Sequence, residues 1–378
     1  MSKRSEVRGQ EPVISYQSSV INKLKLFTVY CSLFTVFCLL FTMTAIAAES
    51  AIKLYSTPLE RSLPIAISAD AKGQVWFVEL NVNKIAMFQP ETSVFFEYDI
   101  PTTRSMPTDI AVDANGIVWF TEQDGNQIGR FDPRTKTFNK EYEIPTPNSQ
   151  PTRIALDNSG NVWFTEFYGN KIGRLDTKKG TITEYPIPTL LSQPIGIAVD
   201  IKGQIWFIET QANKLARFSP ATGKFKEYAI EKSTFSAPNE IAVDKDGNIW
   251  FSERINMRLV RFSHATEQFK RFNIPGKGVP EGIAADRKGN IWFCDKHGGK
   301  VGMLNPGKGE FVEFNVGGGA QPFDIVVDTS NNVWFTEIGT NNIGRLNISG
   351  AMIEGSKSAK LSIRLNLEQR KLFERKHE

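Results

Sequence analysis

Short apolar runs recur along most of this chain, without the spacing of three and four residues that is typical of a helix. The copy from Pro238 to Pro275 shows the pattern well. Its apolar runs predict four short strands, at residues 241–244, 249–253, 259–262 and 269–274. An Asp-Gly pair at Asp246-Gly247 separates the first two runs, and tight hairpins favour this pair because glycine accepts a positive φ. Each copy is therefore expected to form a small antiparallel sheet.

All seven tryptophans occupy one position of this repeat, and each is followed by phenylalanine. They are Trp76, Trp119, Trp163, Trp206, Trp250, Trp292 and Trp334, spaced 42 to 44 residues apart. Successive strand residues point to opposite faces, so the Trp and the Phe are each expected to meet a neighbouring copy. Four short strands repeated at this period predict an all-β protein, a seven-bladed β-propeller of four-stranded antiparallel blades over residues 50–348.

The seventh copy contains only three of its four strands, at residues 325–328, 333–337 and 343–346. A counterpart of the missing strand lies at the other end of the chain, where residues 52–57 resemble the outer strand at residues 225–230. We therefore expect this N-terminal strand to complete the last blade and close the ring, which removes a free sheet edge. The alternative is that residues 360–367 take that place.

The first 48 residues predict export. Residues 1–25 carry five basic and two acidic residues, and the stretch from Leu26 to Ala48 carries no charge and ends in Ala-Ile-Ala-Ala. This order is typical of a secretory signal peptide cleaved after Ala47 or Ala48, and the apolar stretch is also long enough for an uncleaved membrane anchor of about 20 residues. We expect a periplasmic or secreted propeller that contacts a membrane only through this segment, followed by a charged C-terminal tail at residues 349–378.

Charge and cysteine content narrow the possible functions. The pI of about 8.8 arises from the two ends of the chain, because residues 26–350 contain 33 basic and 35 acidic residues. A near-neutral body gives no electrostatic basis for binding nucleic acid. Cys294 is the only cysteine after the N-terminal segment, so no disulfide can form within the propeller. We expect a monomer with a small-molecule or cyclic peptide ligand at the mouth of the channel.

A ring of acids is predicted at one mouth of the central channel, because the start of each innermost strand and the end of the second strand lie on the same face. Clustered carboxylates suit Mg²⁺, with Ca²⁺ as the alternative. The competing interpretation is structural: the acids hold backbone amides, or pair with recurring arginines of the third strand (Arg130, Arg174, Arg217, Arg261 and Arg345). The acids are Glu79, Glu122, Glu166, Glu209, Glu253, Asp295 and Glu337.

Positions that break the repeat are the better candidates for function. They are Asp109, Arg153, Asn239, Glu240, Glu281, Asp295, His297 and Asp324. His297 is the histidine that the fold can bring to the mouth, and the alternative for it is a surface loop position before Gly298-Gly299. For substrate binding we propose Asp109, Glu122, Arg153, Glu166, Asn239, Glu240 and Glu253.

Trp-Phe-Thr-Glu followed by Asn-x-Ile-Gly-Arg, as in Trp119–Arg130, Trp163–Arg174 and Trp334–Arg345, resembles the streptogramin (virginiamycin B) lyase family. Glu-Tyr-x-Ile-Pro at Glu141–Pro145 and Glu184–Pro188 is also similar to that family. The resemblance covers residues 50–347. It implies opening of a cyclic depsipeptide antibiotic at its ester by elimination, with Mg²⁺ held by glutamate and a histidine as the base.

This chain departs from the family pattern at the residues to which the resemblance assigns the chemistry. The late blades of the family have Pro-His where this chain has Pro280-Glu281 and Pro322-Phe323, and Gln321 replaces an acid. A histidine that follows the last ring acid is also missing here. Glu337 matches the family's metal glutamate. A lyase is therefore expected to hold its metal through Glu337, Asp295 and Asp324, and to take the proton with His297 or Glu281.

Two other functions use the same mouth. A metal-dependent lactonase, as in the related gluconolactonase-like propellers, would hold its metal through Glu, Asn and Asp, with Asn239 and Asp324 as candidates. A non-catalytic propeller would bind a ligand or partner protein there. The fold alone does not distinguish these functions.

Overall fold

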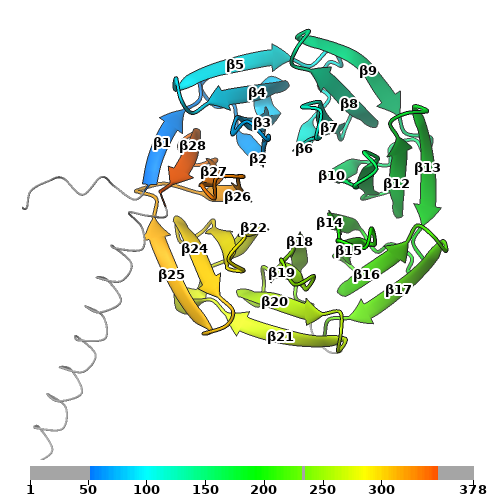
Figure 1. The fold of residues 1–378 in the computed structure, drawn as a ribbon, viewed down its shortest axis with the longest axis vertical. Helices are drawn as coiled ribbons and strands as arrows, with labels where there is room; N and C mark the ends of the chain where they lie inside the picture. The colour runs from blue at the N-terminus through cyan, green and yellow to red at the C-terminus, as the bar shows by residue number, and fades with distance from the viewer. Residues whose placement is uncertain (1–51, 232–234, 348–378) are drawn as a thin grey trace, which may run out of the picture. The chain divides into compact units, whose positions relative to one another are not determined.

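The computed structural model describes residues 52–231 and 235–347, which form a ring of seven four-stranded antiparallel sheets (Figure 1). The predicted seven-bladed β-propeller is confirmed. The predicted signal or anchor at residues 1–48 and the tail at residues 349–378 lie outside the described residues. Within the described part of the chain, no helix has the length and apolarity needed to cross a membrane.

Blades 1 to 6 each use four consecutive strands, from β2–β5 to β22–β25, and blade 7 combines β26, β27 and β28 with β1. The innermost strands are β2 (Pro64–Ala69), β6 (Pro107–Val112), β10 (Pro151–Leu156), β14 (Pro194–Val199), β18 (Pro238–Val243), β22 (Pro280–Ala285) and β26 (Pro322–Val327). The second strands are β3 (Val75–Glu79), β7 (Val118–Glu122), β11 (Val162–Glu166), β15 (Ile205–Glu209), β19 (Ile249–Glu253), β23 (Ile291–Asp295) and β27 (Val333–Glu337).

The outer half of each blade is built in the same order. The third strands are β4 (Lys84–Gln89), β8 (Gln127–Asp132), β12 (Lys171–Asp176), β16 (Lys214–Ser219), β20 (Arg258–Ser263), β24 (Lys300–Asn305) and β28 (Asn342–Leu346). The outermost strands are β5 (Val94–Asp99), β9 (Thr137–Glu143), β13 (Thr181–Pro186), β17 (Lys224–Ala229), β21 (Gln268–Asn273), β25 (Glu310–Asn315) and β1 (Ile52–Ser56). Two short 3-10 helices are added, η1 (Leu80–Val82) and η2 (Pro275–Lys277).

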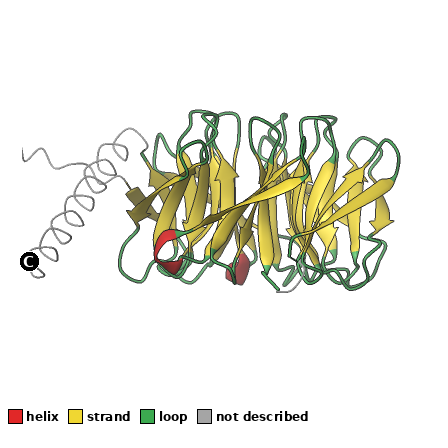
Figure 2. Cartoon of the chain, turned by 90° about the horizontal axis from the view of Figure 1, so that it is seen from below, coloured by secondary structure: helices red, strands yellow, loops and turns green. Residues whose placement is uncertain are grey.

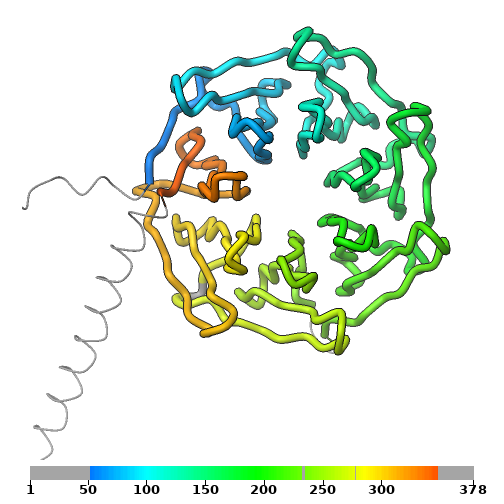
Figure 3. Tube along the Cα trace, in the orientation of Figure 1, coloured from blue at the N-terminus to red at the C-terminus, as the bar shows by residue number. Residues whose placement is uncertain are grey.

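The ring is closed by the N-terminal strand, as the sequence predicts. β1 pairs antiparallel with β28, with Ile52 opposite Leu346 and Ser56 opposite Asn342. The first and last described strands therefore lie side by side in blade 7 (Figure 3). Residues 52–56 occupy the outer position of this blade, and residues 360–367, the alternative, lie outside the described residues.

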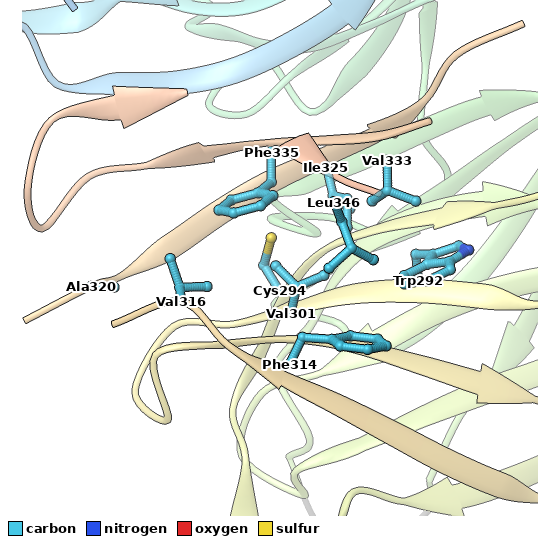
Figure 4. Close-up of a cluster of buried hydrophobic side chains, with 10 residues drawn as sticks. All are labelled: Trp292, Cys294, Val301, Phe314, Val316, Ala320, Ile325, Val333, Phe335 and Leu346. Atoms are coloured by element: carbon cyan, nitrogen blue, oxygen red, sulfur yellow. The ribbon is translucent and has the colours of Figure 1, made fainter. Parts of the chain in front are cut away.

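Each tryptophan packs against the Trp-Phe phenylalanine of the next blade, so the repeat itself builds the core between blades. Between blades 6 and 7, Trp292 and Phe335 belong to one buried cluster with Cys294 (Figure 4). The glycine of the Asn-x-Ile-Gly-Arg motif makes room for the phenylalanine. A Cβ on Gly344 would lie 2.0 Å from the ring of Phe335. The expectation that Trp and Phe face opposite neighbours is confirmed.

The loops gather on two faces of the ring (Figure 2). On one face each innermost strand begins and each second strand ends, since Pro280 is paired with Asp295 and Pro322 with Glu337. We call this face, with the loops that precede the innermost strands and those that follow the second strands, the mouth face. The turns between the innermost and second strands, such as the one from Asp244 to Asn248, lie on the opposite face.

Candidate functional site

The seven ring acids are buried beneath the loops of the mouth face. The six glutamates are fully buried and Asp295 is 2% exposed. Asp295 accepts the amides of Val279 and Gly298 through Oδ1, each at 2.9 Å. One oxygen of Glu337 accepts the amides of Gln321 and Gly339, at 2.5 and 2.7 Å. These two acids hold the loops that cover them, as the structural interpretation predicts, whereas neither carboxylate oxygen of the ring glutamates in blades 1 to 4 has a hydrogen-bond partner among the described residues.

Three of the acids predicted to bind substrate, Glu122, Glu166 and Glu253, belong to this buried set. Burial, together with the neighbouring Glu141, raises the pKa of Glu122 to about 7. Burial and Glu184 raise the pKa of Glu166 to about 8. Glu253 is ion-paired with Arg258 of the next strand. The structure places all three within their own blades, and none of them presents surface to the channel.

The five recurring arginines of the third strand do not pair with the ring acids, unlike Arg258 at the start of β20. The register sets Arg345 opposite Trp334, whereas Glu337 is opposite Asn342. The Arg345 guanidinium lies 5.3 Å from the centroid of the Trp334 ring and donates to Asn332. This part of the structural hypothesis was wrong, because three residues along a strand separate the tryptophan from the acid.

The carboxylates predicted to hold Mg²⁺ do not fit a shared metal site. The second oxygen of Glu337 accepts the Thr340 amide at 2.8 Å, so both of its oxygens are engaged by backbone donors. Asp324 accepts the amides of Ile325 and Ile67, at 2.9 and 3.0 Å. Among the described residues, no group of three or more His, Cys, Asp and Glu side chains is arranged to hold a metal ion. Of the two residues proposed for a lactonase, Asn239 donates its side-chain amide to Glu281 at 3.4 Å.

Arg153 lies at the centre of a buried charge cluster formed by the innermost strands. Its guanidinium is 2.6 Å from Glu240 in blade 5 and 3.6 Å from Asp109 in blade 2. Reaching blade 5 from blade 3 requires Arg153 to pass blade 4, where the equivalent position is Gly196. A Cβ on Gly196 would lie 2.5 Å from the carbonyl oxygen of Asn239. Blade 4 therefore contributes only backbone at this point.

The cluster contains more carboxylates than one arginine can neutralise. Burial raises the pKa of Asp109 to about 7 against the attraction of Arg153, and Asp324 and Glu240 add to the rise. Burial also raises the pKa of Glu240 and of Asp324. Asp109 additionally accepts the amide of Ile154 in the next blade, at 2.7 Å. Four of the predicted site residues, Asp109, Arg153, Glu240 and Asp324, thus form one group that links blades.

A second group of irregular residues lies at blades 5 to 7. Glu281 begins β22, and its carboxylate is 3.1 Å from Arg254 and 3.4 Å from the side-chain amide of Asn239. Burial raises the pKa of Glu281, against the attraction of Arg254, Lys296, Arg153 and His297. The Lys296 ammonium lies 5.2 Å from the centroid of the Phe323 ring in blade 7. The structure thus brings Asn239 and Glu281 together and leaves His297 exposed at the rim.

Arg254 and Lys296 were missed by sequence reasoning, although the repeat contains a signal for both. They immediately follow the ring acids of blades 5 and 6. The same position is uncharged in the other copies, with Leu80, Gln123, Phe167, Thr210 and Ile338. Comparing the residue that follows each ring acid across the seven copies, and not only the acids, would have identified both cations.

The second group also lies where a hydrogen bond that is repeated between other neighbouring blades is missing. We call this Asn–Ser hydrogen bond the lock between blades. In five junctions an asparagine before the third strand accepts from a serine of the next connecting loop. Asn170, for example, accepts the amide and hydroxyl of Ser192, at 2.7 and 2.9 Å. The equivalent positions in blades 5 and 6 are Met257 and Gly299. The junctions on both sides of blade 6 therefore depart from the pattern. The locks are Asn83–Ser105, Asn126–Ser149, Asn170–Ser192, Asn213–Ser236 and Asn341–Ser62.

Exposed apolar side chains surround part of the same face. Leu190 and Leu191 are 83% and 81% exposed, and Tyr168 in the adjacent loop is 63% exposed. Ile255 and Phe235 extend this set across blades 4 and 5, at 53% and 45%. We call these five residues the apolar rim. A cluster of exposed apolar residues on one face is typical of a surface that binds a ligand or partner.

Comparisons with known proteins agree with the fold described above. The model of the virginiamycin B lyase family matches residues 40–161 and 135–356. A streptogramin B lyase structure is 30% identical, with a TM-score of 0.73, covering 78% of this chain and 97% of its own. Virginiamycin B lyase from Staphylococcus aureus is 29% identical, with a TM-score of 0.73, covering 78% of this chain and 98% of its own.

A catalytically inactive histidine-to-alanine variant of the Staphylococcus aureus enzyme, in a structure with quinupristin, is also 29% identical, with a TM-score of 0.72 and coverage of 78% and 98%. The hydrazine synthase of Kuenenia stuttgartiensis shares only the fold, at 13% identity and a TM-score of 0.65, covering 77% of this chain and 97% of its own. No curated protein matches this chain.

Proposed function

This chain belongs to the virginiamycin B lyase family, and we propose that it is an exported propeller that binds a cyclic peptide or similar small ligand at the mouth face of blades 4 to 7. One observation carries the proposal. The residues that break the seven-fold repeat (Asn239, Arg254, Glu281) contact one another where the locks between blades are absent. A repeat that only builds a ring has no need of such a group.

The apolar rim supports a ligand with a large apolar surface. Leu190 and Leu191 expose most of their side chains at the tip of the loop before β14. Burying two leucine side chains against a ligand contributes roughly 3 kcal/mol or more to binding. Polar contacts around Glu281 would then orient the ligand beside this apolar contact. The ligand is met outside the cytoplasm, because the N-terminal residues predict export.

Binding is tested with a type B streptogramin by equilibrium dialysis against the purified full-length protein. We expect the antibiotic to bind and to be recovered unchanged. The double variant Leu190→Ser/Leu191→Ser should weaken binding by about a hundredfold or more, because it removes the apolar contact area of both leucines. Ile201→Ser is the matched control, since Ile201 is 73% exposed in a turn on the opposite face of blade 4. Absence of binding, or equal losses in both variants, would overturn the proposal.

A second candidate function is ring opening of the peptide by elimination, favoured by the environment of Glu281. Its carboxylate is almost fully buried, and burial raises its pKa, which makes it a stronger base than an exposed glutamate. In this role Glu281 would take the proton α to the carbonyl, the ester C–O bond at the adjacent carbon would break with the carboxylate as the leaving group, and Arg254 would stabilise the negative charge that develops.

The products of the same incubation, with Mg²⁺ or with EDTA, separate the two functions. Elimination gives a linear product that elutes differently and has no added water. Hydrolysis by a lactonase would add the mass of water. Glu281→Gln should abolish elimination, whereas a product formed at an unchanged rate by this variant would exclude Glu281 as the base.

A further inference from the structure

Lys296 is a cation at the mouth face that has no carboxylate partner. Among the described residues its ammonium makes no ion pair and lies over the ring of Phe323, 5.2 Å from the centroid. Its backbone amide bonds to the carbonyl of Val279, two residues before Glu281, at 3.3 Å. The lysine is thus fixed beside the start of β22, where its charge attracts Glu281 without forming a salt bridge with it.

Arg254 approaches the same place from blade 5. One of its nitrogens contacts the Glu281 carboxylate at 3.1 Å, while 44% of the arginine side chain remains exposed. The other oxygen of Glu281 accepts a hydrogen bond from the side-chain amide of Asn239. A guanidinium has five N–H donors, so one contact with Glu281 leaves donors that a ligand can use.

Asp295, which precedes Lys296 in the chain, is not available to either cation. Asp295 is 2% exposed and is held beneath the loop by the amides of Val279 and Gly298. Exposed His297 adds a further N–H donor at the rim when it is protonated. Two fixed cations and a histidine therefore surround one carboxylate, beside an aromatic ring.

We infer that Arg254, Lys296 and His297 form a binding site for the carboxylate of a ligand, and that Phe323 packs against an apolar or aromatic group next to that carboxylate. Glu281 occupies part of this site as an internal competitor for Arg254. The inference rests on the proposed function, because it uses the same mouth. It adds that the physiological ligand is an acid.

The geometry favours a carboxylate as the anion. The planar guanidinium of Arg254 already binds one carboxylate, that of Glu281, and its fork matches the two oxygens of such a group. Phe323 adds an apolar surface that inorganic phosphate cannot use. An aromatic acid therefore makes both contacts, whereas phosphate makes only the ionic one.

The test uses 3-phenylpropionate as the probe, its neutral amide as the matched ligand and inorganic phosphate as the second anion, titrated into the full-length protein by ligand-observed NMR. We expect the acid to bind at least about fivefold more tightly than the amide and more tightly than phosphate. Lys296→Gln should reduce binding of the acid about fivefold. Lys288→Gln, at an exposed lysine on the opposite face of blade 6, should leave it unchanged.

Glu281→Gln gives the most discriminating result. If Glu281 competes with the ligand for Arg254, removing its charge should tighten binding of the acid several-fold. If the cations serve only to neutralise Glu281, the same variant should leave binding unchanged. Arg254→Gln leaves the buried carboxylate of Glu281 without its ion pair, which could change binding by itself. The double variant Arg254→Gln/Glu281→Gln is therefore measured with it, because it removes that charge.

Equal binding of acid and amide, or tighter binding of phosphate, would overturn the carboxylate site. If the streptogramin binds through the apolar rim while the acid and its amide are not distinguished, only this inference fails. If neither the antibiotic nor the acid binds, the proposed function fails with it.

Discussion

An aspartate at the end of the innermost strand organises the tryptophan strand that follows it. In blade 5, Asp244 accepts the amides of Asp246 and Asn248 at 2.9 Å and the indole N–H of Trp250 at 2.8 Å. The same indole contact is present in blades 2 to 7, with Asp113, Asp157, Asp200, Asp244, Asp286 and Asp328 as acceptors. One side chain thus fixes both the turn and the orientation of a core residue.

Replacing this aspartate should therefore be costly. We expect Asp244→Ala to lower the free energy of unfolding by about 3 kcal/mol, because two backbone amides, the side-chain amide of Asn248 and the buried indole N–H of Trp250 lose their acceptor. Urea denaturation followed by tryptophan fluorescence measures the change. Asp246→Ala, two residues away on an exposed side chain, should change stability by no more than about 0.5 kcal/mol. Equal effects would show that the turn tolerates loss of the acceptor.

At the scale of elements, closure by β1 depends on one aromatic side chain more than on strand length. The Tyr55 ring lies 4.5 Å from the centroid of Phe88 in blade 1 and 6.1 Å from that of Trp334 in blade 7. β1 has only five residues, of which Ile52 and Tyr55 are partly buried and the other three are exposed. Tyr55 therefore connects blade 7 to blade 1 across the closure.

Tyr55→Ala should lower the free energy of unfolding by about 2 kcal/mol or more, because it removes a partly buried aromatic side chain from the junction. Leu54→Ala is the control on the same strand, since Leu54 is 37% exposed, and it should cost less than about 1 kcal/mol. Thermal unfolding of both variants checks the prediction. A similar loss in both would mean that pairing of the β1 backbone, and not Tyr55, holds the ring closed.

Much of the fold could be predicted because equivalent positions in the seven copies indicate how the strands of each blade pair. Seven Trp-Phe pairs, the turn glycines and the missing outer strand were sufficient for blade number, strand order and closure. The candidate site was less predictable. The repeat places Glu166 at the mouth end of its strand, but it does not reveal that the following loop folds over the carboxylate. The contact between Arg153 and Glu240 skips one blade and depends on the missing side chain at Gly196, which no local pattern indicates.

At the scale of the whole molecule, the Arg153 cluster connects blades that do not touch. Arg153 contacts carboxylates from blades 2 and 5, and the charge of Asp324 in blade 7 acts on the same group. The carboxylates have raised pKa values, so the folded protein binds more protons than the unfolded chain between about pH 4 and pH 7. Stability is consequently lost as the pH rises through this range.

Arg153→Met should deepen this loss, because the buried carboxylates lose the charge that opposes their raised pKa values. We expect the variant to be about 3 kcal/mol less stable than the native protein at pH 8. The difference should be much smaller at pH 5, where Asp109 and its neighbours are protonated. Urea denaturation at both pH values measures it. Adding Glu240→Gln should recover part of the stability at pH 8, and a difference that is independent of pH would contradict this account.

The pairing of β1 with β28 also determines how the ring responds to mechanical force. Ile52 lies opposite Leu346, so both ends of the described fold leave from the same end of one antiparallel strand pair, on the face away from the mouth. A pull between these ends loads the hydrogen bonds one at a time, as in a zipper, rather than all together in shear. The strand that completes the ring at equilibrium is therefore the first to detach under tension.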